Sequence, residues 1–117
     1  MKTELVPITI TEEMVREFER IFGRQSKLPP TFPMIFYQYI DIPWRDPTTP
    51  ILRKQYCTAT RELVVGETYH CQVSLEYERQ KGTKLFYNQV LTGYDERGEE
   101  CFRCLSELAA NLPSAEK

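Results

Sequence analysis

Four cysteines are the residues whose type and spacing first suggest chemistry, because thiolates ligate zinc and form disulfides. They are Cys57, Cys71, Cys101 and Cys104. Cys101 and Cys104 have the Cys-x-x-Cys spacing of zinc ligands and redox pairs. Residues three apart on a regular strand point to opposite faces, so these two sulfurs should diverge unless a bulge or turn intervenes. The pattern predicts structural thiols and no metal site or cofactor, with zinc or redox chemistry as the alternative.

A single histidine, His70, is the only side chain whose ordinary pKa lies near neutrality. Ser74 falls on the same face of the expected strand, but four residues of strand separate the two by about 13 Å. A Ser–His hydrogen bond is therefore excluded, and with it a serine-type triad. The sequence predicts a surface histidine, and proton transfer by His70 stays the alternative.

The elements that must position these side chains begin with an apolar segment between prolines. Two consecutive prolines hold the chain extended, and Thr31 can then cap a helix whose first turn accepts another proline. The run that follows is apolar on every side and stops at Pro43, too short to cross a bilayer. A helix without a solvent face must be wrapped by the rest of the chain. Gln38 and Asp41 are polar exceptions that need a partner or line a cavity.

From residue 56 onward the sequence indicates strands separated by turns. Alternation of apolar and polar residues is clearest over 69–78 and indicates a strand with one buried face. Further strands are expected over 55–63, 83–94 and 100–108, with turns at Gly66, Gly82 and Gly98. The simplest architecture is α+β, in which one curved antiparallel sheet wraps the apolar helix.

An additional N-terminal helix is expected over residues 12–22. Thr11 is placed to cap this helix, and Gly23 is placed to end it. Apolar side chains at helical spacing predict one buried stripe, made of Met14, Val15, Phe18, Ile21 and Phe22. The acidic and basic residues between them are interpreted as the solvated face of the helix.

Length and charge limit the classes of protein to which the chain can belong. The 117 residues suit one domain, with a core over about 5–110 and a frayed tail over 111–117. The net charge of -2 and the mixed signs argue against nucleic-acid binding, which requires a basic face. No signal peptide, lipidation motif or membrane span is visible, so a cytoplasmic protein without a membrane partner is expected.

Two strings of residues resemble the MaoC-like hot-dog family, specifically the non-catalytic N-terminal half of (R)-specific enoyl-thioester hydratases and 3-hydroxyacyl dehydratases. They are Pro29-Pro30-Thr31-Phe32-Pro33, which follows Val15-x-x-Phe18 and Gly23, and Arg61-Glu62-Leu63-x-x-Gly66-Glu67-Thr68. The resemblance covers about residues 5–110. It implies a hot-dog fold, in which the sheet curves around one central helix. It also implies that two such units pair edge to edge, as a homodimer, a heterodimer or a tandem fusion.

The resemblance further implies that this chain lacks the catalytic pair. Active members carry an aspartate and a histidine in a Gly-Asp-x-Asn-Pro-x-His segment after the first helix. Residues 22–28 take that place here and contain neither, and Arg24 and Lys27 cannot act as the base and acid at their ordinary pKa. The leading hypothesis is a non-catalytic subunit of a hydratase or dehydratase of fatty acid metabolism. It would bind acyl-CoA or acyl carrier protein and pair with itself or with a catalytic hot-dog partner.

The ligand groove implied by the family lies along the central helix at the dimer seam. The positions expected at this groove are Phe36, Tyr37, Gln38, Tyr39 and Asp41. Most of these aromatic side chains are interpreted as core. Hot-dog thioesterases place an acid or amide on this helix, which gives an alternative function as an acyl-CoA thioesterase. In that case Asp41 would be the base, and Gln38 would orient the attacking water.

A third hypothesis is an assembly or regulatory module without ligand chemistry. Near the proline-rich loop that follows the helix, Arg45, Arg53 and Lys54 could dock the phosphates of coenzyme A or an acidic carrier protein. Otherwise the three are ordinary surface charges.

Overall fold

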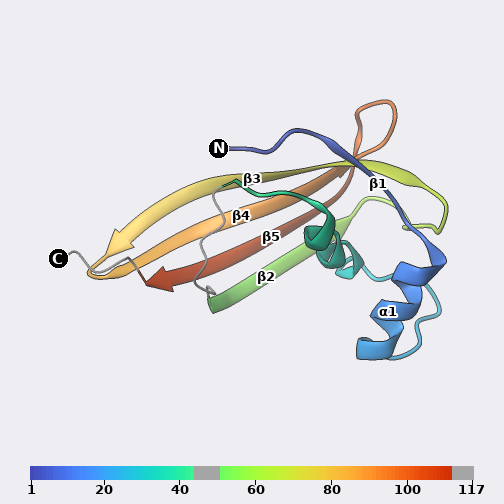
Figure 1. Cartoon of the computed structure of the whole chain (residues 1–117), viewed down its shortest axis with the longest axis horizontal. Helices are drawn as coiled ribbons and strands as arrows, with labels where there is room; N and C mark the ends of the chain where they lie inside the picture. The colour runs from blue at the N-terminus through green and yellow to red at the C-terminus, as the bar shows by residue number, and fades with distance from the viewer. Residues whose placement is uncertain (44–50, 112–117) are drawn as a thin grey trace.

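A computed structural model describes residues 1–43 and 51–111 and shows an α+β fold with one antiparallel sheet and two helices (Figure 1). The elements in chain order are β1 (Val6–Thr9), α1 (Glu12–Phe22), the 3₁₀ helix η1 (Phe32–Tyr39), β2 (Ile51–Ala59), β3 (Thr68–Lys81), β4 (Lys84–Tyr94) and β5 (Glu100–Asn111). Asn111, expected in the tail, is thus the last residue of β5, and the rest of the expected tail lies outside the described residues. Among the described residues, no helix is long and apolar enough to cross a membrane.

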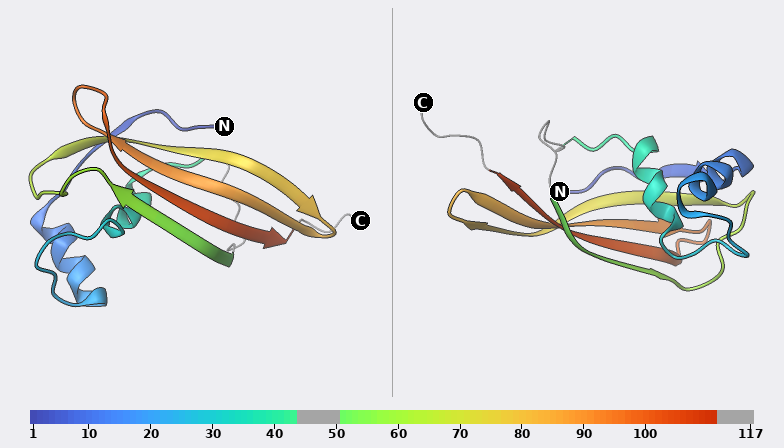
Figure 2. Two further views of the ribbon diagram at one scale, coloured as in Figure 1. Left: turned by 180° about the vertical axis from the view of Figure 1, so that it is seen from behind. Right: turned by 90° about the horizontal axis from the view of Figure 1, so that it is seen from below.

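The sheet has the strand order β1-β3-β4-β5-β2, and every neighbouring pair is antiparallel. Both helices pack on one face, which we call the helix side (Figure 2). The two edges are β1 and β2, and β2 is the longer, with nine residues. The hairpins β3–β4 and β4–β5 form the centre of the sheet, and they position the side chains of the helix side.

The ends of α1 agree with the local signals in the sequence. The Thr11 hydroxyl accepts a hydrogen bond of 3.2 Å from the Met14 amide, which caps the first turn. At the other end, the Gly23 amide donates to the Glu19 carbonyl at 2.8 Å. Gly23 has φ 86°, a conformation that glycine adopts at helix ends without strain. The predicted helix is therefore confirmed at both ends.

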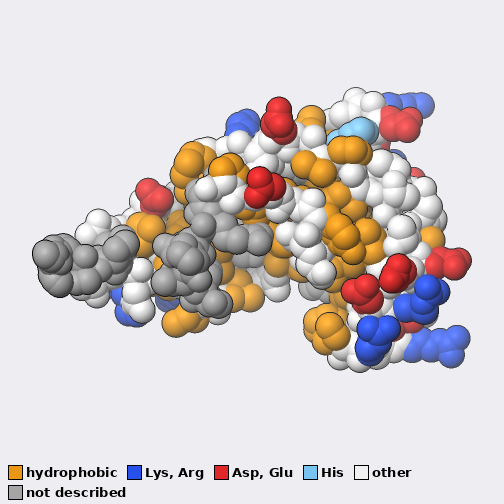
Figure 3. Space-filling view, viewed as in Figure 1, with side chains coloured by type: hydrophobic (Ala, Val, Ile, Leu, Met, Phe, Trp, Pro, Cys, Tyr) orange, Lys and Arg blue, Asp and Glu red, His pale blue; other side chains and the backbone are white. Residues whose placement is uncertain are grey.

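The predicted apolar stripe of α1 is wrong at its C-terminal end. Met14 and Phe18 are buried, but Ile21 and Phe22 are 75% and 62% exposed. The helix extends beyond the edge of the sheet, so only its first turns contact the core (Figure 1). Acidic and basic side chains are intermixed over its surface (Figure 3), as the sequence predicts for a solvated face.

η1 is a 3₁₀ helix and is shorter than the sequence suggests. It ends at Tyr39, several residues before Pro43. Thr31 makes no side-chain cap. Instead, the Phe32 amide donates to the Pro29 carbonyl at 2.9 Å, so backbone groups begin the helix.

The expectation that η1 has no solvent face is also wrong for the described residues. Phe32 and Phe36 have no exposed surface, whereas Gln38 is exposed and Tyr39 is 47% exposed. The helix lies on one face of the sheet (Figure 2), so its other side has no cover from the described strands.

A chain of aromatic rings joins the two helices to the sheet. Phe18 of α1 contacts Phe32 of η1, with ring centroids 5.2 Å apart. Further along η1, Phe36 contacts Phe102 of β5 at 5.8 Å, and Phe102 contacts Tyr69 of β3 at 5.5 Å. Each buried ring contributes about 2–3 kcal/mol through removal of apolar surface from water. These contacts hold η1 over β5 and form the centre of the core.

The four strands expected from the sequence are confirmed, with different ends. β2 lies over 51–59 instead of 55–63, because Leu63 leaves the ladder and forms an isolated bridge with Leu28. β3 continues to Lys81, but a bulge at Tyr77, which has φ 48°, interrupts its alternation. β1 was not expected, because four residues that include Pro7 are too few to show a period.

Gly93 of β4 faces Phe102 across the sheet, and a Cβ at this position would overlap the Phe102 ring. We expect Gly93→Ala to lower the free energy of unfolding by about 2–3 kcal/mol, because the ring must leave its rotamer or β4 must shift. Urea denaturation measures this loss. As a control, the double variant Gly93→Ala/Phe102→Leu should be more stable than expected from the sum of the two single variants. Strictly additive losses would contradict the overlap.

Candidate functional site

The helix side of the sheet changes from apolar to polar along its length. One row across β2, β5, β4 and β3 consists of Cys57, Cys104, Leu91 and Val73. The next row on the same face consists of Gln55, Ser106, Gln89 and Leu75. We call Gln55, Ser106 and Gln89 the polar row. Ser106 is buried on this face and Gln55 is exposed, so the row places polar groups beside apolar surface, and we take it as the candidate ligand site.

Ser106 is the member of the polar row that most needs a partner. It is 3% exposed, and its hydroxyl has no hydrogen-bond partner within the described part of the chain. A buried hydroxyl without a partner costs about 1–3 kcal/mol, so water, a ligand or another chain is expected to supply one. The Ser106 hydroxyl can therefore exchange a hydrogen bond with a polar group that binds on this face of the sheet.

The residues predicted at the groove differ in their surroundings. Phe36 is completely buried in the aromatic core. Tyr37 is half-buried, whereas Gln38, Tyr39 and Asp41 are exposed at and beyond the end of η1. The exposed three are accessible to a ligand or to a second protein. A role for any of them in ligand binding stays a prediction.

The predicted basic cluster is only partly described. Arg45 lies outside the described residues. Arg53 forms an ion pair with Glu107, with Nη1 and Oε1 3.3 Å apart, and its guanidinium lies 5.1 Å from the centroid of the Phe86 ring. Lys54 is exposed and lies opposite Glu107 in the ladder. A phosphate at this place would compete with the Glu107 carboxylate.

Residues 22–28, at the C-terminal end of α1, cap this helix through Gln25. The Gln25 backbone amide donates to a Glu19 carboxylate oxygen at 3.1 Å. Its side-chain amide donates to the carbonyls of Phe22 and Gly23, at 3.4 and 3.2 Å. These bonds satisfy carbonyls that a helix leaves unpaired at its C-terminus. Residues 22–28 contain no carboxylate or imidazole that could transfer a proton.

His70 lies on the face of β3 opposite to the core. Its neighbours Tyr69 and Cys71 are buried, and alternation along the strand directs His70 away from them. It is half-buried and lines an open pocket of about 400 Å³ together with Leu5. The sheet lies between His70 and η1, so His70 does not form an acid–base pair with Asp41.

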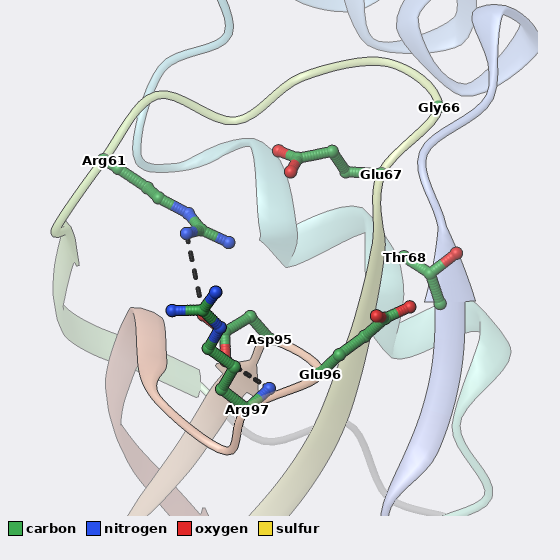
Figure 4. Close-up of a pocket in the computed structure, with 7 residues that line it drawn as sticks. All are labelled: Arg61, Gly66, Glu67, Thr68, Asp95, Glu96 and Arg97. Carbon is green, nitrogen blue, oxygen red and sulfur yellow. Dashed lines mark hydrogen bonds and ion pairs between the residues drawn. The ribbon is translucent and has the colours of Figure 1, made fainter.

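A charged pocket of about 620 Å³ lies where β3 begins and β4 ends (Figure 4). Its lining consists of Arg61, Gly66, Glu67, Thr68, Asp95, Glu96 and Arg97. Arg61 pairs with Asp95, with Nη1 and Oδ2 3.6 Å apart. Glu67 accepts a hydrogen bond of 2.9 Å from the Tyr69 hydroxyl. The sequence marks these segments only as turns, and nothing in it indicates that they meet.

Asp95 organises the turn between β4 and β5. Its Oδ1 accepts hydrogen bonds from the backbone amides of Arg97 and Glu99, both at 2.9 Å. The Glu99 amide is the main cause that holds the pKa of Asp95 below its ordinary value, and Arg97 and Arg61 lower the pKa further. The carboxylate charge therefore stabilises the folded turn.

The Cys-x-x-Cys pair lies at an irregular part of β5. A bulge opposite Tyr94 includes Cys101, and both Cys101 and Cys104 are buried. Their thiols donate to different carbonyls, those of Glu99 at 3.6 Å and Pro30 at 3.7 Å. Within residues 1–43 and 51–111, no group of three metal-ligating side chains comes together. Burial raises the pKa of the Cys71 thiol to about 12.

No family profile matches the sequence, and no curated protein matches it. The fold is similar to that of several solved structures. One is the C-terminally truncated HadBC complex, a (3R)-hydroxyacyl-ACP dehydratase from Mycobacterium tuberculosis, with a TM-score of 0.72 and 12% identity over 94% of this chain and 95% of that chain. The ChsH1-ChsH2 complex of Mycobacterium tuberculosis has a TM-score of 0.70 and 10% identity over 98% of this chain and 91% of that chain. The R-hydratase PhaJ1 of Pseudomonas aeruginosa has a TM-score of 0.64 and 11% identity over 100% of this chain and 87% of that chain. The fold of the chain thus matches that of solved MaoC-like dehydratases and hydratases.

The turn that Asp95 organises should make stability depend on pH. Because the pKa of Asp95 is lowered in the folded state, its contribution is complete above the unfolded pKa of about 3.9 and is lost as pH falls through the folded value. We expect Asp95→Asn to lower the melting temperature at pH 7 and to differ less from the wild type below about pH 4. The control is Glu96→Gln, which removes the exposed neighbouring carboxylate. If the melting temperatures of Asp95→Asn and the wild type differ by the same amount at pH 7 and below about pH 4, the Asp95 carboxylate does not stabilise the turn.

Proposed function

We propose that this chain is a single hot-dog unit that binds acyl thioesters and serves as a non-catalytic subunit of an enoyl-thioester hydratase or a 3-hydroxyacyl dehydratase. The observation that carries the proposal is the loop after α1. On a fold shared with dehydratases and hydratases, this loop contains no acid or base and caps the helix through Gln25.

The chemistry of hydration supports a non-catalytic role. Addition of water to an enoyl thioester needs a base to activate the water and an acid to protonate the α-carbon. His70 lies on the side of the sheet away from η1, and Asp41 is exposed. Neither residue is placed to work with the other, so a catalytic pair would come from a partner.

The polar row is the best candidate for contact with the thioester or its pantetheine arm. The arm carries amides, and amides pair well with the Ser106 hydroxyl and the side chains of Gln55 and Gln89. Tyr37, Gln38 and Tyr39 would border the same region from η1. The acyl chain would lie against the apolar surface beside this row.

The bare end of the sheet supports pairing with a second hot-dog unit. The last six residues of β3 and the first six of β2 are exposed, and this end carries the exposed apolar side chains of Ile51, Leu52, Tyr56 and Tyr77. β2 is also a sheet edge, and a long apolar edge needs a partner. HadBC and ChsH1-ChsH2 are named as two-component complexes. We propose that a second copy or a catalytic hot-dog subunit covers this edge and the open side of η1, which would make η1 a central helix.

The thioesterase alternative depends on Asp41 and Gln38. Both are exposed near the end of η1, where water has access. The other alternative is an assembly or regulatory module without ligand chemistry. In that case Arg45, Arg53 and Lys54 would contact the phosphates of coenzyme A or an acidic carrier protein.

The first test is hydration of crotonyl-CoA and longer enoyl-CoA substrates, followed by loss of enoyl absorbance. The protein is assayed alone and after co-expression with single hot-dog proteins of its source that carry the Gly-Asp-x-Asn-Pro-x-His segment. We expect background rates alone and an increase of at least about 100-fold in the correct mixture, because a positioned acid or base contributes 10²–10⁴-fold.

Two variants separate the alternatives in the same assay. Asp41→Ala should hydrolyse acyl-CoA at the same background rate as the wild type, whereas a lower rate would favour the thioesterase. Ser106→Ala should weaken binding of enoyl-CoA by the mixture, because it removes the hydroxyl and leaves the rest of the side chain in place. Hydration by the wild-type protein alone would contradict the non-catalytic role.

The pairing surface is tested by charge substitution on β2. Leu52→Lys and Tyr56→Lys should each raise the dissociation constant of the homodimer or heterodimer by at least ~30-fold, because they place a charge in the core of the interface. Sedimentation equilibrium measures the constant. The control is Ile21→Lys, at an exposed apolar position on α1, which should leave the dissociation constant unchanged. If all three variants associate equally well, the interface lies elsewhere.

A further inference from the structure

Cys57 and Cys104 face each other directly across β2 and β5. The Thr60 amide donates to the Cys101 carbonyl at 2.8 Å, so residues 60 and 101 form a hydrogen-bonded pair of this ladder. Hydrogen-bonded and non-hydrogen-bonded pairs alternate along antiparallel strands. Three steps along the same register, Cys57 and Cys104 therefore form a non-hydrogen-bonded pair.

The position in the ladder determines how closely the two cysteines approach. Residues of a non-hydrogen-bonded pair have Cα atoms about 4.5 Å apart, closer than those of a hydrogen-bonded pair. Disulfides accept Cα separations of about 4.4–6.8 Å. A bond between the two sulfur atoms is thus possible without movement of either strand over a large distance.

The two thiols also differ in a way that suits sequential oxidation. Cys57 is half-buried on the edge strand, whereas Cys104 is buried and donates to the Pro30 carbonyl. Burial raises the pKa of the Cys104 thiol, and the neighbouring Cys57 thiol raises this pKa further. Cys57 is therefore the thiol that an oxidant reaches first, and Cys104 is the thiol that follows.

The other two cysteines are not placed to compete. Cys71 lies on β3, separated from β5 by β4, and its thiol donates to the Tyr69 carbonyl at 3.6 Å. Cys101 lies at the bulge of β5, and its thiol donates to Glu99. The spacing Cys-x-x-Cys is therefore not the pair that the fold brings together.

We propose that Cys57 and Cys104 are a peroxide-sensitive dithiol that closes to a cross-strand disulfide. Hydrogen peroxide oxidises the Cys57 thiol to a sulfenic acid and is reduced to water. The Cys104 sulfur then attacks the sulfenic sulfur as its proton is lost, the S–S bond forms, the S–O bond breaks, and the hydroxide leaves with that proton as a second water. Two S–H bonds are lost, and one peroxide is consumed for each disulfide.

The disulfide would change two elements that lie near the candidate site. It would tie the edge strand β2 to β5 covalently. It would also remove the proton that Cys104 donates to Pro30, at the start of the segment that leads into η1. This inference does not depend on acyl-thioester binding, and its readout is mass instead of activity.

The experiment uses the full chain, freed of reductant and treated with hydrogen peroxide. Remaining thiols are then alkylated, and the protein is digested with trypsin without reduction. Cys57 lies in tryptic peptide 55–61. Cleavage after Arg103 places Cys101 in peptide 98–103 and Cys104 in peptide 104–117, so the two can be told apart. We expect peptides 55–61 and 104–117 joined, with a mass two hydrogen atoms below their sum, as the dominant oxidised species.

Three variants and a dilution series complete the test. Cys57→Ser and Cys104→Ala should each abolish the linked peptide, whereas Cys101→Ser should leave its yield unchanged. The yield should not depend on protein concentration, and dithiothreitol should reverse it. A dominant link to peptide 98–103, a link that forms only between chains, or free alkylation of Cys57 and Cys104 after oxidation would each overturn the proposal.

Discussion

The Phe102 ring lies against the backbone of Gly93, and the position of both helices follows from this contact. Because Gly93 has no side chain, the ring fills the space above β4 and reaches Phe36 of η1 and Tyr69 of β3. Phe32 then continues the contact to α1. The absence of a side chain at Gly93 therefore leaves room for the aromatic core that joins both helices to the sheet.

The helices cover only part of the sheet, so the covered end and the uncovered end of the sheet differ. Under the helices, the sheet is apolar and closely packed. Beyond η1, the polar row, the buried hydroxyl of Ser106 and the exposed residues of β2 occur together. Such an end is typical of a unit that another chain or a ligand completes, because buried polar groups and apolar edges both need partners.

Much of the fold could be predicted from local signals. Thr11 and Gly23 mark the ends of α1, and alternation over residues 69–73 marks the buried face of β3. The errors share a cause. The exposure of Ile21 and Tyr39 depends on where the sheet ends, and the bulge at Tyr77 depends on the register with β4. Neither the exposure of these side chains nor the bulge is determined by the residues of one helix or strand alone.

By itself, the sequence determined the ends of α1, the order of α1, η1 and the strands β2 to β5, and the absence of an acid–base pair in residues 22–28, because these depend on residue type and short-range spacing. Only the tertiary structure decided which side chains meet. Cys57 faces Cys104 and Arg61 pairs with Asp95 through the register of strands that are distant in the sequence. A shift of one residue in that register would move every side chain to the other face, so these contacts follow from the packing of the whole core.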